Sequence, residues 1–562
     1  MKFLLVGINS KYSHSNPALY YIKEVLKLRF SDIEVVEFTI KTQFFDILDY
    51  IGERSPDVLM LSCYIWNIDY MKYLFEDIKT INKNIKLIIG GPEVSFNSEK
   101  YKKKYPDVDI IMIGNGVRAT EMLLEMNFDV EDKIINGGDE SHAYIPFSEE
   151  YFLKTVADGR IPYYEASRGC PFNCSYCLSS NKTQNMFFKT AETIKKELDF
   201  IVNLRPGLVK FVDRSFNINR RISHKILDYI AGIESDICFH FEIHPAYLNE
   251  SDFEKLRSLP KNRIQAEIGI QSTDPKVLEA VNRKEDIKIV LENTKKLVDL
   301  HNFHQHTDMI IGLPYQDMDS AITSFNEIHE LGADHFQLGF LKVLQGTEIA
   351  GRKNEFEMKF SAKPPYQILK TKWLSYDEIK YWRRIEEHLS SFSNSEQFDN
   401  TVKYLLGREE RPFDFYSKIT DYWIIEKLDF SNHKWTYLGK NLISFVKKIY
   451  PEHLDIIIDY LRMDWAKLAS SHFFPDFLTS AQTAKMKNDY YLRIKESAFY
   501  KQRIKLQYLK KAVFVIPESE YVQTEIGNDT VGFIFYRENK KKFFNYAIKP
   551  ELLYSPDKHP KP

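Results

Sequence analysis

Three cysteines in the middle of the chain have the clearest chemistry. Cys170, Cys174 and Cys177 have the spacing C-x3-C-x2-C, which places three thiolates around one loop. Three thiolates can hold three irons of a [4Fe–4S] cube and leave the fourth iron open to a ligand. A structural zinc site would require a fourth cysteine or histidine at a partner spacing, whereas Cys63 and Cys238 are isolated in the sequence. The spacing therefore predicts an iron–sulfur cluster with an open coordination position.

The segments around these cysteines must form the scaffold that holds them, and they alternate between strand-like and helix-like patterns. Such alternation predicts parallel strands covered by helices, so that residues at the strand ends meet at one edge of a sheet. Ser251–Glu254 is expected to be a capping box at the start of one helix. The expected strands are 163–166, 208–212, 239–243, 265–270, 308–311 and 335–340.

The cysteine spacing, with Tyr176 directly before the last cysteine, resembles the radical S-adenosylmethionine (SAM) superfamily. The resemblance covers about residues 160–350 and implies a partial (βα)6 barrel that binds a [4Fe–4S] cluster and SAM. The runs 241–245, 267–272 and 306–314 are similar to the coproporphyrinogen-oxidase-like branch of this superfamily. The resemblance assigns SAM contacts to Tyr176, Asp213, Glu242, Gln271, Asp308 and Gly312. Asp213 stands where the family has a Gly-Gly-Glu, and the two glycines are missing here.

The N-terminal third also alternates strands and helices. Strand-like runs at 3–6, 33–40, 58–61, 86–89 and 108–113 predict a doubly wound parallel sheet. Such sheets bind ligands at the carboxyl ends of their strands. No GxGxxG follows the first strand, which disfavours a dinucleotide. Glycines at the strand ends either let a ligand approach the backbone or only turn each strand into the next helix.

This pattern, over about residues 1–125, resembles the cobalamin-binding domain that precedes many radical SAM enzymes. The resemblance implies that cobalamin contacts Ser62, Gly90, Gly91, Gly114 and Gly116. Proteins that ligate cobalt through histidine carry D-x-H-x-x-G after the first strand, and the loop 9–16 lacks this motif. His14 is therefore not expected to ligate cobalt. Residues 126–159 are expected to link this domain to the barrel.

The last third of the chain has a different pattern. The alternation breaks around Lys363-Pro364-Pro365, and residues 351–374 are expected to be a linker. A capping box at Ser375–Glu378 starts a mostly helical C-terminal domain, 375–562, which ends with a pair of strands at 512–516 and 531–536. This order of domains resembles cobalamin-dependent radical enzymes with an uncharacterised C-terminal domain.

Basic residues between Arg493 and Lys511 alternate with aromatic residues, including Phe499 and Tyr500. A nucleic-acid surface has this composition. The exposed face of an amphipathic helix has it too, when the aromatic side chains enter the core. We favour the helix, so a nucleic acid is not the preferred substrate.

The whole-chain composition excludes several other classes of protein. The 562 residues predict about three or four domains. Lysine and arginine number 77 against 79 aspartates and glutamates, which argues against a protein that coats nucleic acid or membranes. No apolar run reaches the roughly 18 residues that span a bilayer. Five cysteines in so long a chain indicate a reducing compartment, which predicts the cytoplasm.

Together these features predict an enzyme that works anaerobically. The resemblance implies reductive cleavage of SAM at the cluster, with an electron donor such as a flavodoxin or ferredoxin as partner. The favoured reaction is methylation of an unactivated carbon of an unidentified substrate, with cobalamin as a cofactor. Two alternatives stay open: a non-methylating radical rearrangement, cyclisation or reduction, and a non-enzymatic cobalamin or redox sensor. No catalytic residue is assigned, because Tyr176 and His244 have a stronger claim as core or supporting residues.

Overall fold

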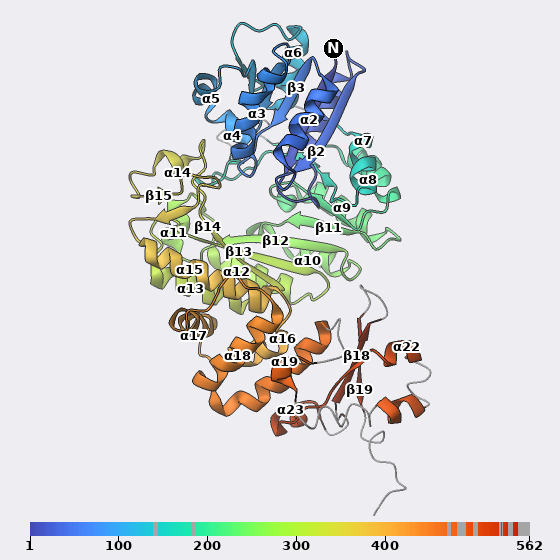
Figure 1. Ribbon diagram of the computed structural model, residues 1–562, viewed down its shortest axis with the longest axis vertical. Coiled ribbons are helices and arrows are strands. Elements are labelled where there is room, and N and C mark those ends of the chain that lie inside the picture. The colour runs from blue at the N-terminus through green and yellow to red at the C-terminus, as the bar shows by residue number, and fades with distance from the viewer. Residues whose placement is uncertain are drawn as a thin grey trace, which may run out of the picture. The chain divides into compact units, whose positions relative to one another are not determined.

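The computed structural model describes residues 1–138, 144–180, 186–468, 474–479, 491–497, 504–527, 530, 532–537 and 543–548. The chain divides into two compact units, Met1–Lys380 and Tyr381–Pro562. The first unit holds two parallel sheets, one in each region where the sequence predicts alternating strands and helices (Figure 1). The second unit is mostly helical. The predicted α/β fold class is therefore confirmed. Among the described residues, no helix has the length and apolar character needed to cross a membrane.

The first sheet has six parallel strands in the order β2-β1-β3-β4-β5-β6. The strands are β1 (Phe3–Asn9), β2 (Ile33–Thr39), β3 (Val58–Ser62), β4 (Lys86–Gly90), β5 (Ile110–Ile113) and β6 (Ile134–Asn136). The sequence predicts the first five of these strands. It does not predict β6 or helix α7 (Glu149–Ala157), which both lie in the expected linker 126–159. The strand order reverses between β1 and β3, and ligands bind parallel sheets at such a switch point.

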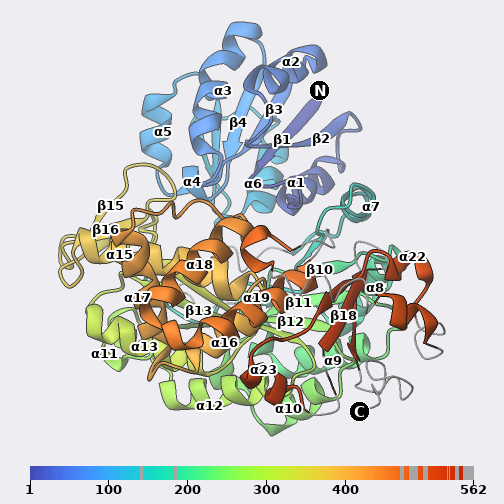
Figure 2. The same cartoon turned by 60° about the horizontal axis from the view of Figure 1, so that its bottom comes forward.

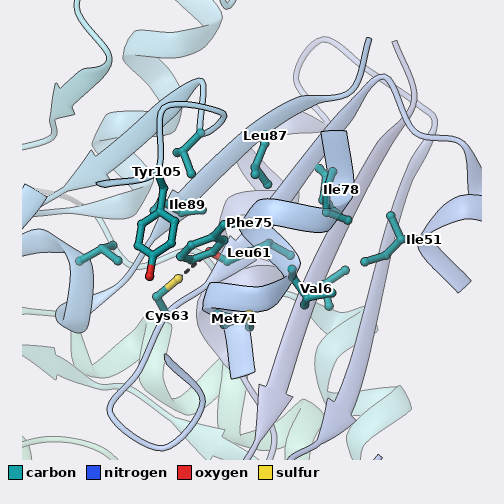
Figure 3. Packing of buried hydrophobic residues seen from close by; sticks show 14 of the residues in the cluster. Val6, Ile51, Leu61, Cys63, Met71, Phe75, Ile78, Leu87, Ile89 and Tyr105 are labelled. Carbon is teal, nitrogen blue, oxygen red and sulfur yellow. Dashed lines mark hydrogen bonds between the residues drawn. The ribbon is translucent and has the colours of Figure 1, made fainter. Parts of the chain in front are cut away.

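Helices cover both faces of this sheet, as the buried, apolar strands require. One face carries α1 (Pro17–Leu26) and α6 (Gly116–Glu125), and the other carries α2 (Phe44–Arg54), α3 (Ile68–Ile81), α4 (Pro92–Ser95) and α5 (Ser98–Lys104). Figure 3 shows the core under α2 and α3, where Val6 and Leu61 of the strands pack with Ile51, Phe75 and Ile78 of the helices.

The second sheet also has six parallel strands, in the order β14-β13-β12-β11-β10-β7. They are β7 (Tyr163–Tyr164), β10 (Leu208–Phe211), β11 (Cys238–Glu242), β12 (Ile264–Gln271), β13 (His304–Ile311) and β14 (His335–Phe340). Each corresponds to a predicted strand. The connecting helices are α8 (Ala191–Asn203), α9 (Arg220–Ala231), α10 (Glu250–Arg257), α11 (Pro275–Ala280), α12 (Ile287–Val298) and α13 (Met318–Glu330), and Figure 2 shows α10, α12 and α13 along one side of the sheet. Buried and half-buried residues alternate along β12 and β13, so every second side chain faces away from the helices.

Two predicted capping boxes have different outcomes. The box predicted at Ser251–Glu254 is wrong, because α10 begins earlier, with Asn249 and Asp252 capping each other. The box predicted at Ser375 and Glu378 is confirmed: Ser375 N–H donates to Glu378 Oε2 at 2.7 Å, and Glu378 N–H donates to Ser375 Oγ at 3.3 Å. It starts α15 (Tyr376–His388). Helix α14 (Glu348–Gly351) ends where the expected linker 351–374 begins. The linker itself contains a hairpin of β15 (Lys359–Phe360) and β16 (Ile368–Lys370).

The second unit packs its aromatic residues inside a helical core. Trp382 and Trp423 are fully buried. A π-helical turn, η4 (Leu389–Asn394), follows α15. The larger helices after it are α16 (Asp399–Leu406), α17 (Pro412–Ile425), α18 (Trp435–Ile449) and α19 (Leu454–Leu468). Two short helices, α22 (Leu506–Leu509) and α23 (Glu520–Glu525), lie further along the chain. The predicted strand pair is present as β17 (Val513–Val515) and β18 (Gly532–Arg537), and a third antiparallel strand, β19 (Phe543–Ile548), extends it.

The aromatic residues of the basic stretch can be placed only in part. Tyr508 packs against a buried cluster that includes Phe514 and Tyr536. This packing favours the amphipathic-helix interpretation over a nucleic-acid surface. Phe499, Tyr500, Lys501 and Arg503 lie outside the described residues.

Candidate functional site

The three cysteines lie on a loop that follows a short strand. Strand β8 (Ser167–Arg168) pairs antiparallel with β9 (Phe187–Phe188), and the cysteine loop comes after β8. Two backbone hydrogen bonds tie this loop to distant segments: Ser175 N–H donates to Val281 O at 3.0 Å, and Ile349 N–H donates to Ser175 O at 2.9 Å. The loop is therefore held in place from two sides.

A cavity of about 230 Å³ opens beside this loop. Most of the predicted cluster and SAM residues line it: Cys170, Cys174, Cys177, Tyr176, Glu242, Gln271 and Asp308. The cavity is also lined by residues that the sequence does not single out: Phe172, Arg214, Ser215, Glu267 and Arg283. Of the predicted residues, only Asp213 and Gly312 lie outside the lining. Because parallel strands end at one edge, residues over a hundred positions apart in the sequence come together here.

Two buried side-chain oxygens in this cavity lack hydrogen-bond partners among the described residues. Gln271 ends β12 at a β-bulge with a φ of +73°, a left-handed conformation that non-glycine residues rarely adopt. The Gln271 Oε1 and Asp308 Oδ1 atoms are both buried without a hydrogen-bond partner among the described residues. Buried polar atoms normally have partners, and strained backbone is concentrated at ligand sites. The cavity therefore fits a ligand that brings hydroxyl or amino donors to these two oxygens.

The carboxyl groups of the cavity have opposite electrostatic environments. Burial raises the pKa of Asp308 to about 8, and the nearby Glu267 and Glu242 carboxylates add to the effect. A hydrogen bond from His240, 3.3 Å away, lowers the pKa of Glu267 to about 2. Burial also raises the pKa of Glu242, against the opposing effect of Arg214 at 3.8 Å. At neutral pH the cavity thus holds a protonated Asp308 beside an ionised Glu267.

Arg283 organises the wall behind the cysteine loop. Its guanidinium donates to Gly269 O at 2.8 Å, to the Tyr176 hydroxyl at 3.2 Å and to Glu285 Oε1 at 2.6 Å. Arg283 and Arg214 are the cationic side chains among the described residues that line the cavity. The sequence analysis missed both: Arg214 adjoins the expected carboxylate Asp213, which was an available signal, whereas nothing local to Arg283 marks it.

The donor set of the loop fits an iron–sulfur cluster. Burial raises the pKa of Cys174 to about 11 and also raises that of Cys170, so these thiols release their protons only to a strong positive charge such as bound iron. Among the described residues, no three such side chains already converge at metal-ligand distances. The thiolates of a [4Fe–4S] cube bind different irons, so convergence on a single point is not required of them.

The structure places Asp213 and Gly312 behind the cavity instead of in its wall. Both carboxylate oxygens of Asp213 accept hydrogen bonds, from Ala166 N–H at 3.1 Å and from Ser167 Oγ at 2.5 Å, and burial raises its pKa to about 7. Asp213 thereby holds β8 in place. Gly312 has a φ of +93°, and a Cβ there would lie 2.6 Å from Ile368 Cγ2. Gly312 thus allows β16 to pack closely.

The residues predicted to contact cobalamin gather at the carboxyl ends of the first sheet. Ser62 Oγ accepts a hydrogen bond from Asn16 Nδ2 at 2.9 Å, and Asn16 Oδ1 is buried without a partner among the described residues. This unsatisfied oxygen lies at the switch point and fits a ligand with amide donors, such as cobalamin. The His14 Nδ1 atom is hydrogen-bonded to the Tyr163 hydroxyl at 2.5 Å, so this nitrogen already has a partner within the chain.

The glycines at these ends are required by contacts within the chain itself. Gly91 has a φ of +113°, and a Cβ there would lie 2.5 Å from Cys63 O. Gly114 has a φ of +68°, and its Cβ would lie 2.4 Å from Gly138 O. Turning strands into helices therefore accounts for these two glycines without a ligand. Gly90 and Gly116 have no such close contact, and Gly116 begins α6.

Three protein-family models match the chain in succession. Residues 4–124 match the B12 binding domain, residues 164–328 match the Radical SAM superfamily, and residues 354–530 match a protein of unknown function, DUF4080. The first two matches coincide with the two parallel sheets.

Curated relatives match about half of the chain. The cobalamin-dependent radical SAM methyltransferase TokK of Streptomyces tokunonensis is 25% identical over 52% of this chain and 48% of its own length. The 2-(S-pantetheinyl)-carbapenam-3-carboxylate methyltransferase of Streptantibioticus cattleyicolor is 26% identical over 50% of this chain and 46% of its own. The chain thus spans about half the length of these curated relatives.

Solved structures share the fold at low sequence identity. The cobalamin-dependent SAM radical enzyme OxsB, with aqua-cobalamin and SAM bound, matches with a TM-score of 0.52 and 14% identity over 82% of this chain and 75% of its own. The radical SAM methyltransferase TsrM from Kitasatospora setae matches with a TM-score of 0.51 and 14% identity over 64% of this chain and 76% of its own. The domains imply a [4Fe–4S] cluster, SAM and cobalamin as cofactors. The chain thus carries a B12-binding domain, a radical SAM domain and a DUF4080 region, in that order.

Proposed function

We propose that this protein is a cobalamin-dependent radical SAM methyltransferase that methylates an unactivated carbon of a small-molecule substrate. One observation carries the proposal: the three cysteines share a single cavity with Glu242, Gln271 and Asp308, and two polar atoms in that cavity lack hydrogen-bond partners in the part of the chain that the structure describes. The named relatives TokK and the carbapenam methyltransferase support methyl transfer as the reaction class.

The chain's own residues would hold the cofactors as follows. The thiolates of Cys170, Cys174 and Cys177 would bind three irons and leave the fourth open. When bound, the cluster supplies an electron for cleaving SAM, and cobalamin supplies a methyl-carrying metal centre. Glu242 suits an ammonium group, and Gln271 with protonated Asp308 suits hydroxyl groups, because each offers acceptor oxygens.

The cationic side chains would orient an anionic group. A guanidinium pairs with a carboxylate through two parallel hydrogen bonds, and Arg214 and Arg283 both face the cavity. Arg283 already donates to Tyr176, Gly269 and Glu285. These three hydrogen bonds fix the Arg283 side chain. The Arg214 side chain is more exposed than that of Arg283, so Arg214 is freer to turn towards a ligand carboxylate.

The cavity must also exclude water from reactive species. The Phe172 ring lies tilted against the rings of His244 and Tyr247, with ring centroids 4.4 Å and 5.3 Å away, which gives one wall an aromatic cover. His244 is itself buried, and burial lowers its pKa to about 4, so it stays neutral at physiological pH. A neutral aromatic wall keeps this side of the cavity dry.

The test is an anaerobic product analysis. The full chain is reconstituted with iron, sulfide and cobalamin, SAM and a reductant are added, and nucleosides are quantified by mass spectrometry. Flavodoxin and ferredoxin, the electron-donor classes that we propose, are compared with a chemical reductant. Both 5′-deoxyadenosine and S-adenosylhomocysteine are expected, because one SAM is cleaved and another gives its methyl group. Deoxyadenosine alone would contradict methyl transfer, and neither product from a protein with an intact cluster would contradict an enzyme.

A pair of cysteine variants makes this test specific. Cys174→Ala is expected to abolish deoxyadenosine formation, because two thiolates hold the cluster poorly. Cys238→Ala is the matched control, since Cys238 lies on β11 outside the cavity lining, and it should retain both the iron content and the activity. Equal losses in the two variants would mean that the effect is structural.

A further inference from the structure

A second cavity, of about 350 Å³, lies beyond the carboxyl end of β4. Its walls come from α3, from α5 and the turn before it, and from the hairpin of β15 and β16, all within the first unit. Its lining shares no residue with the cavity beside the cysteines. A volume of this size falls at the lower end of the range for small-molecule sites, about 300–1,000 Å³.

Positive charge dominates the lining of this cavity. Lys72 of α3 and Lys100 and Lys104 of α5 line it. Lys100 and Lys104 are four residues apart on one helix, so they share a face. Among the described residues, no carboxylate lies within ion-pair distance of either, whereas Lys72 is paired with Asp69 at 2.6 Å. Lys100 acts on Glu93 only through space, and Lys104 lies over the Tyr105 ring with its Nζ 5.1 Å from the ring centroid, so both ammonium groups lack a carboxylate in direct contact among the described residues.

The only carboxyl group among the described lining residues is already engaged. Glu93 accepts a hydrogen bond from the Tyr366 hydroxyl, and it is itself buried. Burial raises the pKa of Glu93, which weakens its ability to neutralise the lysines. The remaining polar lining, Asn97, Gln345 and Ser361, is uncharged and offers hydrogen-bond donors.

The hairpin wall is held against the sheet domain by specific contacts. The Tyr366–Glu93 hydrogen bond joins residues 273 positions apart. Tyr366 adopts a φ of +59°, a left-handed conformation that a non-glycine residue retains only where its surroundings impose it. Gly346, on the loop before the hairpin, is so close to the Phe96 ring that a Cβ there would lie 2.1 Å from it. The cavity is therefore bounded by two fixed walls.

We propose that this cavity is a binding site for a phosphorylated small molecule, separate from the cofactor cavity and from the glycine turns of the first sheet. A phosphate group carries close to two negative charges at neutral pH, which matches the two unpaired lysines of α5. A single carboxylate would leave one of these ammonium groups unbalanced. The uncharged donors then face the rest of the molecule.

Calorimetric titration with inorganic pyrophosphate tests the site directly. The full chain, reconstituted with its cluster and cobalamin, is titrated in a buffer free of phosphate and sulfate. We expect one binding event that weakens as salt is added, because the lysines are partly exposed. The double variant Lys100→Gln/Lys104→Gln should bind at least about tenfold more weakly, since two charge-assisted contacts are lost.

The same helix provides a matched control. Lys102→Gln/Lys103→Gln removes the same charge from α5, but neither residue lines the cavity, and Lys102 pairs with Asp132 at 2.8 Å on the surface. This variant should bind pyrophosphate within about twofold of the native protein, because only long-range charge changes. Equal weakening in both double variants would overturn the proposal, since it would show non-specific attraction to a basic helix.

Two further outcomes would also overturn it. Absence of binding to the native chain would refute the site outright. Binding that is present without cobalamin and lost when cobalamin is loaded would show that the anion occupies the cobalamin site instead. Neither readout uses catalytic turnover, so failure of this proposal and failure of the proposed methyltransferase activity are distinguished.

Discussion

Asp308 makes the folded protein less stable at neutral pH than it would be with an uncharged residue there. Its carboxyl group is buried, its Oδ1 lacks a partner among the described residues, and its pKa in the folded protein is about 8, against an ordinary value near 4. A carboxyl group with a raised folded pKa favours folding only while it is protonated. Stability is therefore full below about pH 4 and is lost as the pH rises towards 8.

The size of the effect follows from the shift. Each pH unit between the unfolded and folded pKa values changes the free energy of unfolding by about 1.4 kcal/mol. At pH 7 the deficit relative to an uncharged isostere is thus roughly 4 kcal/mol, and it levels off above about pH 8. Asp308→Asn replaces the ionisable carboxyl group with a neutral amide and breaks no hydrogen bond to Oδ1, which accepts none within the described residues. The variant should be the more stable protein at neutral pH.

Thermal unfolding without SAM, measured from pH 5 to pH 9, checks this reasoning. The difference in midpoint between Asp308→Asn and the native protein should widen from pH 5 to about pH 8 and then stay constant. The surface variant Asp132→Asn is the control: its pKa is lowered by Lys102, so losing it cannot stabilise the protein increasingly towards pH 8. A constant difference between Asp308→Asn and the native protein over this range would refute a protonated, buried Asp308. The stabilised variant should bind SAM more weakly if Asp308 contacts the ligand, as sites that sacrifice stability for binding do.

Three other substitutions probe the support of the site. At about pH 4, where the raised pKa of Asp213 costs little, Asp213→Leu should lower the free energy of unfolding by roughly 2–4 kcal/mol, because two donors are left without acceptors. Denaturant unfolding of the apo-protein at that pH would show it, and an unchanged midpoint would contradict the assignment. Gly91→Ala should lose bound cobalamin and about 2 kcal/mol or more of stability, because a Cβ at this positive φ would meet backbone atoms and distort the turn. Gly116→Ala should keep both the cobalamin and the stability. Ultraviolet–visible titration with cobalamin compares the two variants, and equal affinities would contradict the steric argument. Arg283→Gln should destabilise the protein by about 3–5 kcal/mol, because the Glu285 carboxylate stays buried without the Arg283 guanidinium. Thermal unfolding measures this, and an unchanged midpoint would show that the Arg283–Glu285 ion pair is not needed.

The sequence predicted the sheets and the shared position of the strand ends for one physical reason. Regular alternation of apolar strands and helices requires parallel strands, and parallel strands end at one edge. Glu242, Gln271 and Asp308 lie on three neighbouring strands, and the cavity brings them together as expected. The alternation predicts only that strand ends meet; the choice of these three residues came from the resemblance to the radical SAM superfamily.

Elements without a periodic pattern were missed. Strand β6 has three residues and the β8 and β9 strands have two each, too short for an alternation of apolar and polar positions to be read. They nevertheless matter, since β8 leads into the cysteine loop and is held there by Asp213. Pairing of such short strands depends on neighbours that are distant in the sequence.

Arg283 shows why the chemistry of a site exceeds its motifs. A buried arginine is tolerated only when its donors are satisfied, and here the partners come from the cysteine loop, from β12 and from the residue two positions ahead. Read along the chain, Arg283 is one of many basic residues, and local patterns assign it to the surface. Gly312 shows the converse. The resemblance assigned it a contact with SAM, yet the contact that requires glycine is with Ile368, on a hairpin in the expected linker. A motif predicts the backbone conformation that its residues allow, but the partner that the conformation serves is determined by which segments the fold brings beside it.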